Sequence, residues 1–335
     1  MTAPELGREE PHPDEERFVR SILQAIEHSL AKDYGSTPRG RRFHAKSLGL
    51  ADAVFEVEPG LPHELQVGLF ASPRAFPALV RFTNAAQRAG ADGGRSTKGM
   101  AIKILDVPAS GFEVDPFGTT QDLVLTTDRV LVPGTVRKYE LSLRGLFGNL
   151  LCLLAIVLNP GNWRSLLGMV CRQRRVPNLL EQTYASCTPY LFGDGNAVKW
   201  HARPQQPAIS KMPDHPDRDF LRHRLRDDLA TAAASFEICI QRQLDPRTEP
   251  IEDSAVEWRT PLVKVATLTI PVQDVEAVDQ TRREQTITFS PWHAMREHRP
   301  LGGNNRLRRR IYAELSRARG LLAQPPSSTP TERAR

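Results

Sequence analysis

The strongest constraint on the fold of this chain is a series of short runs rich in β-branched and aromatic residues. Side chains of these kinds favour strands, and the Gly and Pro residues near the runs keep each strand short. A sheet of many short strands closes into a barrel or forms a sandwich, so we expect one of these two architectures. The predicted strands lie at residues 53–59, 66–70, 78–84, 99–107, 122–127, 196–204, 235–244 and 262–272.

Helical segments flank the predicted strands. Asp14 can cap a helical arm over residues 14–35, which carries one apolar stripe for packing on a larger body. The stripe consists of Phe18, Val19, Ile22, Leu23, Ile26 and Leu30. Further helices are predicted over 140–182, near 217–233 and over 305–322. The acidic, proline-bearing residues 1–13 are expected to form a flexible leader, and the composition of residues 323–335 predicts a disordered tail.

Composition excludes several classes of protein. With 40% hydrophobic and 25% charged residues among 335, the chain has the material for a core, unlike a disordered or fibrous protein. The net charge of +6 is too small a surplus for this length to indicate a nucleic-acid partner. The four cysteines include no C-x-x-C pair, and no signal-peptide core is visible, so we expect a cytoplasmic protein.

One uncharged stretch allows two interpretations. The 19 residues between Arg144 and Arg164 carry no charge, yet the unbroken apolar run from Leu150 to Leu158 is far shorter than the roughly 20 residues of a spanning helix. The segment 146–158 is therefore either a buried helix or an interfacial segment. The basic CRQRR sequence that follows favours peripheral membrane contact through residues 146–175 in the second case.

The last predicted helix carries an unusual tyrosine. Arg308, Tyr312, Leu315 and Arg319 are spaced i, i+4, i+7 and i+11, which places them on one stripe. A phenol has a pKa of about 10, and a guanidinium that donates to its oxygen favours the phenolate. Haem iron is one of the few partners that uses a phenolate ligand.

Six segments, in chain order from about residue 40 to 319, resemble motifs of the haem catalase family, in particular its short bacterial type. This resemblance implies an α+β fold: a catalase-like antiparallel β-barrel with flanking helices over residues 36–322. The segments are RRFHAKSLGLADAVFEVEP (41–59), SPRAFPALVRFTN (72–84), RSTKGMAIKILD (95–106), DLVLTTDRV (122–130), NAVKWHARPQQP (196–207) and FSPWHAMREHRPLGGNNR (289–306).

The same resemblance implies a haem b cofactor and a role for each matched residue. Tyr312 would ligate the iron, with Arg308 holding it as the phenolate. His44 would be the distal histidine, Thr83 the hydroxyl that orients it, and Thr127 the catalytic group where the family has a distal asparagine. The haem propionates would pair with Arg41, Arg81 and Arg319. Because Arg41 and His44 are three residues apart, both can reach haem only if the strand bends or meets the haem edge.

The implied activity is consumption of hydrogen peroxide or of an organic or lipid hydroperoxide by catalase or peroxidase chemistry. His44 would move the proton during O–O heterolysis. Thr126 and Thr127 in place of the asparagine put efficient dismutation in doubt. Two alternatives stay open: rearrangement of fatty-acid hydroperoxides, as in catalase-related allene oxide synthases, and a weakly active, membrane-facing haem-binding module. A homo-oligomer is compatible with either. His201, His293 and His298 are expected to be structural.

Overall fold

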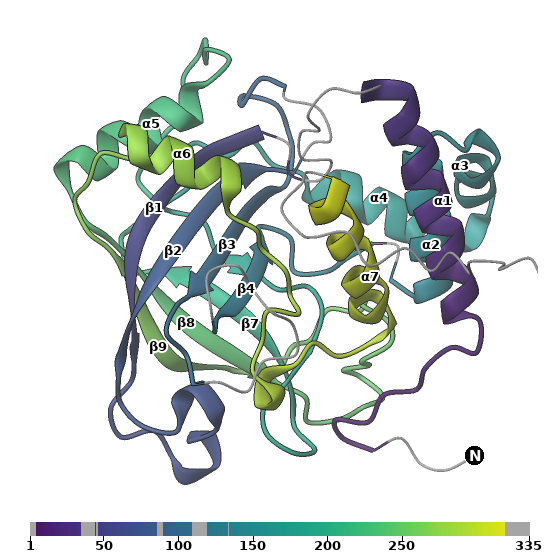
Figure 1. The fold of residues 1–335 in the computed structure, drawn as a ribbon, viewed down its shortest axis with the longest axis horizontal. Coiled ribbons are helices and arrows are strands. Elements are labelled where there is room, and N and C mark those ends of the chain that lie inside the picture. Colours follow the sequence, from purple (N-terminus) through teal and green to yellow (C-terminus); the bar gives the residue numbers. More distant parts are fainter. Residues whose placement is uncertain are drawn as a thin grey trace, which may run out of the picture.

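In the computed structural model, described residues are 5–34, 44, 46–85, 90–108, 119–132 and 134–318. Their strands form one antiparallel sheet in the order β5-β4-β3-β2-β1-β9-β8-β7-β6 (Figure 1). Because β5 also pairs with β7, eight strands form a closed ring and β6 lies outside it. The architecture is a barrel. The strands are β1 (Lys46–Val57), β2 (Ala75–Asn84), β3 (Lys98–Ile104), β4 (Gln121–Thr126), β5 (Tyr184–Ala185), β6 (Tyr190–Leu191), β7 (Ala197–Pro204), β8 (Ala234–Arg242) and β9 (Leu262–Ile270).

Alternation along the strands separates the barrel interior from its outer face. In β2, Val80 and Phe82 belong to the main core inside the ring. Leu79 belongs instead to a small cluster that includes Ile287, which follows the helix outside the sheet. Arg81 and Thr83 have the same parity as Leu79, so they lie on the outer face.

Several elements differ from the sequence prediction, among them the two-residue strands β5 and β6, which were not predicted. Residues 66–70, predicted as a strand, contain a 3-10 helix at Gly68–Phe70, because Gly68 takes a positive φ of 54° that an extended strand does not allow. Helix α6 (Val278–Thr286) was not predicted, since only Gln280 of its nine residues is buried and its sequence shows no apolar stripe.

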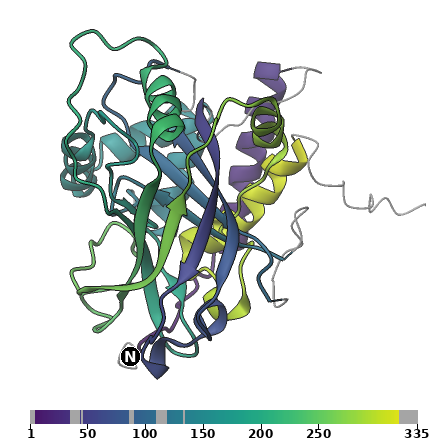
Figure 2. The same cartoon turned by 90° about the vertical axis from the view of Figure 1, so that its left-hand side faces the viewer.

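The remaining helices are α1 (Glu15–Tyr34), α2 (Val136–Leu146), α3 (Leu150–Val157), α4 (Trp163–Arg172), α5 (Phe220–Thr231) and α7 (Gly303–Ala318). All of them except α5, which lies beside α6, gather on one side of the barrel (Figure 1). Figures 1 and 2 show α1 and α7 side by side. Phe18 and Ile22 of α1 pack with Leu143 of α2 and with Leu307 and Ile311 of α7. The stripe predicted for the N-terminal arm thus holds the C-terminal helix.

The apolar segment 146–158 is not the buried helix of the first interpretation. Only Cys152 and Ile156 of α3 are buried, whereas Leu151 is 78% exposed and Leu158 is 70% exposed. Among the described residues, no single helix is long and apolar enough to cross a membrane. One bent pair, Leu150–Val157 with Pro160–Arg172, passes that test together by length and composition, with a bend of 77°.

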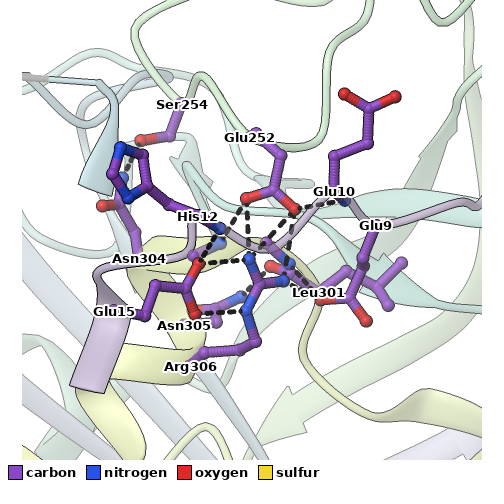
Figure 3. Close-up of polar contacts among 12 residues, drawn as sticks. Glu9, Glu10, His12, Glu15, Glu252, Ser254, Leu301, Asn304, Asn305 and Arg306 are labelled. Carbon is purple, nitrogen blue, oxygen red and sulfur yellow. Dashed lines mark hydrogen bonds and ion pairs between the residues drawn. The ribbon is translucent and has the colours of Figure 1, made fainter. Parts of the chain in front are cut away.

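Part of the segment expected to form a flexible leader, residues 1–13, contacts the start of α7 through Glu9. Arg306 of α7 lies among three carboxylates, with its Nη2 2.7 Å from Glu15 Oε1 and 3.0 Å from Glu252 Oε2, and its Nη1 bonded to Glu9 (Figure 3). Glu9 also accepts from the Gly302 backbone N–H at 2.8 Å. These ion pairs connect residues 9–15 to the start of α7, a contact that the composition of residues 9–15 alone does not reveal.

Replacing Arg306 with alanine should lower the free energy of unfolding by about 3 kcal/mol, because three carboxylates then lose their shared cation in a partly buried site. Burial raises the pKa of Glu15, but bonds from Arg306 and the His12 backbone outweigh it, so the net pKa lies below 4.5. A depressed carboxyl pKa stabilises the fold above that ordinary value and loses its effect as the pH falls through the folded pKa. Urea unfolding should therefore show the deficit of the variant at pH 7 and a smaller deficit below about pH 4.5.

The control is Arg317→Ala, which removes an i, i+3 pair with Glu314 on the same helix. We expect it to cost less than about 1 kcal/mol. Equal effects of the two variants would contradict an anchoring role for Arg306.

Candidate active site

His44 lies at a bend in the chain directly before β1. Its φ is +51°, a left-handed conformation that is uncommon for residues other than glycine. Because of this bend, the side chain of His44 does not follow the alternating directions of a regular strand, and a site shared with Arg41 requires such a bend. Arg41 itself lies outside the described residues. His44 Nδ1 is 2.7 Å from Thr83 Oγ1 on β2. The predicted pair of distal residues is therefore in hydrogen-bond contact.

The imidazole of His44 lies over a glycine in the outer face of the sheet. Gly99 of β3 is the register partner of both Thr83 of β2 and Thr126 of β4, so these residues share a face. A Cβ at residue 99 would lie 2.5 Å from His44 Nδ1 and closer still to Thr83 Oγ1. Only glycine gives the ring this place.

In the next register row on the outer face, β3 and β4 carry small, partly exposed apolar side chains. Arg81 pairs with Ala101, and Ala101 pairs with Val124 of β4. Ala101 and Val124 are partly exposed, whereas their strand neighbours Ile102, Leu123 and Leu125 are buried. Together with Gly99 they form a flat, apolar floor beside His44. The sequence signal that could have found it is the i, i+2 spacing of small residues in RSTKGMAIK.

Arg81 supports the bend at His44. Its guanidinium is buried, its Nη2 donates to the His44 carbonyl oxygen at 3.3 Å, and its Nε lies 3.9 Å from Glu284 of α6. Its predicted role with a propionate stays a prediction. Arg319, like Arg41, lies outside the described residues.

The two threonines at the end of β4, Thr126 and Thr127, have different partners. Thr126 Oγ1 donates to the Asp128 carbonyl at 3.1 Å and lies 3.3 Å from Cys187 Sγ. Thr127 Oγ1 accepts from the Lys98 backbone N–H at 3.1 Å, so it extends the β3–β4 ladder. The register therefore places Thr126 on the row of Thr83 and Gly99, whereas the role of Thr127 stays a prediction.

A second phenol, that of Tyr139, lies beside the two proximal residues predicted on α7, Arg308 and Tyr312. The Arg308 guanidinium hydrogen-bonds the Tyr139 hydroxyl of α2 and acts through its charge on Tyr312. Burial raises the pKa of the Tyr312 phenol, and although the positive charge of Arg308 lowers it, the net pKa lies above its ordinary value. Tyr139 was missed because nothing near it in the sequence marks it; only the packing of α2 against α7 brings it to Arg308.

A short segment connects the two sides of the site. Arg308 Nη1 donates to Thr188 Oγ1 and to Asn305 Oδ1, both at 3.3 Å. The neighbouring Cys187 contacts Thr126 on the outer face of β4. Arg308 is thus two contacts away from the row that carries Thr83 and Gly99.

The three histidines expected to be structural, His201, His293 and His298, are buried. Burial lowers the pKa of His201 and of His298 to about 4, so both are neutral. His298 Nε2 accepts from the Leu69 backbone N–H at 3.1 Å. His293 Nδ1 lies 2.9 Å from Asp122, which also binds Lys103 at 2.8 Å and so ties the segment before α7 to the barrel.

The residues present fit a flat cofactor with a phenolate-bound metal. Gly99, Ala101 and Val124 provide the floor, and Tyr312 beside Arg308 is a phenol that could ligate a metal once deprotonated. No group of three or more His, Cys, Asp or Glu in the described part of the chain could hold a metal ion, so a metal here would rely on another donor such as this phenol.

Comparison with solved structures identifies the class of fold. Catalase A of Saccharomyces cerevisiae superposes with a TM-score of 0.66 at 16% identity, over 95% of this chain and 67% of its own. A fungal catalase gives 0.65 at 15% identity, over 96% and 66%. A bacterial catalase gives 0.63 at 14% identity, over 95% and 63%. This chain spans about two thirds of their length.

The chain therefore has the catalase fold, as its motifs predicted. No protein-family model matches the sequence, and neither does any curated protein. At 14–16% identity the likeness concerns the fold alone.

Replacing Gly99 with alanine should lower the free energy of unfolding by about 1–3 kcal/mol, because the added methyl group collides with His44 and Thr83. Gly94→Ala is the matched control, since a Cβ there meets only the Ala91 carbonyl oxygen at 3.9 Å. Its effect should stay within about 0.5 kcal/mol. Urea unfolding measures both, and identical values would mean that the imidazole does not lie on Gly99.

Proposed function

We propose that this chain binds haem b between the outer face of β3–β4 and helix α7 and consumes hydroperoxides by catalase or peroxidase chemistry. The observation that carries the proposal is the His44–Thr83 pair lying over Gly99. An imidazole oriented by a hydroxyl over a flat apolar floor suits proton transfer to a small polar molecule. The catalase fold supports the same coarse function.

Tyr312 would hold the haem, with Arg308 keeping its phenolate charged. Arg308 shares its guanidinium between Tyr139 and Tyr312, so Tyr139 modulates how strongly that charge favours the Tyr312 phenolate. Haem supplies an iron that exchanges electrons with the O–O bond of the substrate and is tuned by this anionic ligand.

His44 would carry the proton. With Nδ1–H donating to Thr83 Oγ1, the Nε2 atom is unprotonated and can take a proton from one peroxide oxygen and return it to the other. Thr83 orients the imidazole ring through this bond, and Arg81 holds the backbone bend by its bond to the His44 carbonyl.

A second candidate is the rearrangement of fatty-acid hydroperoxides. It is favoured by Thr126, whose hydroxyl donates to Asp128 and so is committed away from a substrate. No side-chain amide then takes the predicted asparagine position to orient hydrogen peroxide.

Three assays on the haem-loaded protein separate the candidates. Oxygen release indicates dismutation, oxidation of a dye indicates peroxidase action, and loss of a lipid diene absorbance without reductant indicates rearrangement. Bound haem without turnover of any of these substrates indicates the weakly active module.

Replacing Tyr312 with phenylalanine should abolish the absorption bands of tyrosinate-ligated ferric haem and weaken haem retention, because the only proposed iron ligand is lost. Tyr139→Phe is the control, since it removes a phenol bound to the same guanidinium but not the ligand. Spectra of both variants reconstituted with haem b measure the effect. A Tyr312→Phe spectrum equal to that of the parent protein would refute the ligand assignment.

Replacing His44 with asparagine should reduce turnover about 10²–10⁴-fold at unchanged haem content, since a general acid–base group is removed. Asparagine tolerates the positive φ of this position, so the bend should persist. Thr83→Val should cost about tenfold, because it removes only the orienting bond. Steady-state assays of haem-loaded variants test both, and undiminished turnover in His44→Asn would exclude the histidine from the reaction.

A further inference from the structure

The α3–α4 hairpin, residues 150–172, exposes apolar side chains instead of burying them. In α3 only Cys152 and Ile156 turn inward. In α4 no residue is buried, and Leu167 is 65% exposed. Exposed large apolar side chains on and beside the hairpin are Leu146, Leu150, Leu151, Leu153, Leu154, Val157, Leu158, Trp163, Leu167 and Val170. A contiguous apolar surface of this kind marks an interaction site.

Helix α4 carries its apolar residues on one stripe. Trp163, Leu167 and Val170 are spaced i, i+4 and i+7, and all three are exposed. The stripe therefore continues the apolar surface of α3 across the bend. A helix with one exposed apolar face and basic neighbours is typical of a segment that lies in a lipid interface.

The charge around the hairpin has one sign. Residues 141–180 contain five arginines and no acidic residue. Four of them, Arg164, Arg172, Arg174 and Arg175, are exposed, and none forms an ion pair with any described residue. Such a surface is complementary to anionic headgroups.

The bend between the two helices satisfies its own polar groups. Trp163 Nε1 donates to the Val157 carbonyl at 2.7 Å, and Asn162 Nδ2 donates to the Ile156 carbonyl at 3.1 Å. At the other end of α3, Asn149 Oδ1 accepts from the Cys152 N–H at 3.2 Å. Internal bonding of backbone groups lowers the cost of placing them against hydrocarbon.

We propose that the α3–α4 hairpin docks this protein on an anionic lipid membrane. With eight residues, α3 is about 12 Å long, far less than the ~30 Å hydrocarbon core, and the 77° bend turns α4 away from the axis of α3, so the hairpin fits the interface better than a straight span. A second copy of the chain fits this surface less well than a membrane does. A two-fold contact through the surface would bring the arginines of both copies together, and their like charges would repel.

Docking does not depend on the proposed haem chemistry, because the hairpin packs on α2 and contains none of the proposed site residues. Figure 1 shows α3 at the outer edge of the helical layer, and its packing partner is α2. The contact can therefore be tested by binding alone.

The experiment is co-sedimentation of the full chain with vesicles of phosphatidylcholine, with and without phosphatidylglycerol, at low and high salt. We expect binding to the anionic vesicles that weakens as salt rises. Leu151→Glu combined with Leu167→Glu should reduce that binding at least about tenfold, because carboxylates then face the lipid. Arg172→Gln, Arg174→Gln and Arg175→Gln together should abolish the preference for anionic lipid.

The matched control is Leu244→Glu combined with Val278→Glu, two exposed apolar residues outside the hairpin and its basic flank. It adds the same charge and should leave vesicle binding unchanged. Circular dichroism verifies the fold of each variant. The proposal is overturned if the parent protein does not bind anionic vesicles, or if sedimentation shows a dimer that the hairpin variant dissociates.

Discussion

The barrel is closed by only two residues, Tyr184 and Ala185 of β5, and the rest of the structure depends on that closure. Ala185 pairs with Thr126 of β4 on one side and with His201 of β7 on the other. Directly afterwards the chain turns at Cys187, whose φ is +59°, and places Thr188 against Arg308. The stretch that joins the ends of the sheet therefore also sets the position of the guanidinium beside Tyr312.

Helix α7 follows the barrel strands in the chain, so contacts such as that between Thr188 and Arg308 are what fix its position against the barrel. Its first turn is held by the carboxylates around Arg306 and by Asn305, whose carbonyl accepts from the Trp292 indole at 2.7 Å. Its apolar side packs on α1 and α2. The site proposed here thus combines an early strand with a late helix, and neither end can form it without the helical layer between them.

Helix α2 links the two proposals. It presents Tyr139 to Arg308 in the candidate site, and α3 packs against it before continuing into the exposed hairpin. A membrane bound by the hairpin would hold the haem-site layer close to the lipid phase. Lipid hydroperoxides are therefore the substrate class in which the membrane proposal and the proposed chemistry meet, whether the outcome is reduction or rearrangement.

Local sequence determined most of the strands, because β-branched residues and turn residues act within a few positions. It failed at residues 66–70, where a positive φ at Gly68 overrides an apolar run. The motifs also singled out His44 and Thr83, which lie in hydrogen-bond contact, and Arg308 and Tyr312, whose roles stay predictions. The floor of Gly99, Ala101 and Val124, by contrast, depends on strand register, and Tyr139 depends on helix packing.

The sequence by itself determined that residues 146–158 are uncharged and mostly apolar, and that the four arginines after them, at 164, 172, 174 and 175, have no acidic neighbour along the chain. Only the tertiary structure decided that the segment faces outward. Apolar side chains favour any non-aqueous surroundings, and whether these come from the protein's own core or from a partner depends on how the remaining elements fill the interior. Here the strands and the other helices fill it, and the hairpin stays outside.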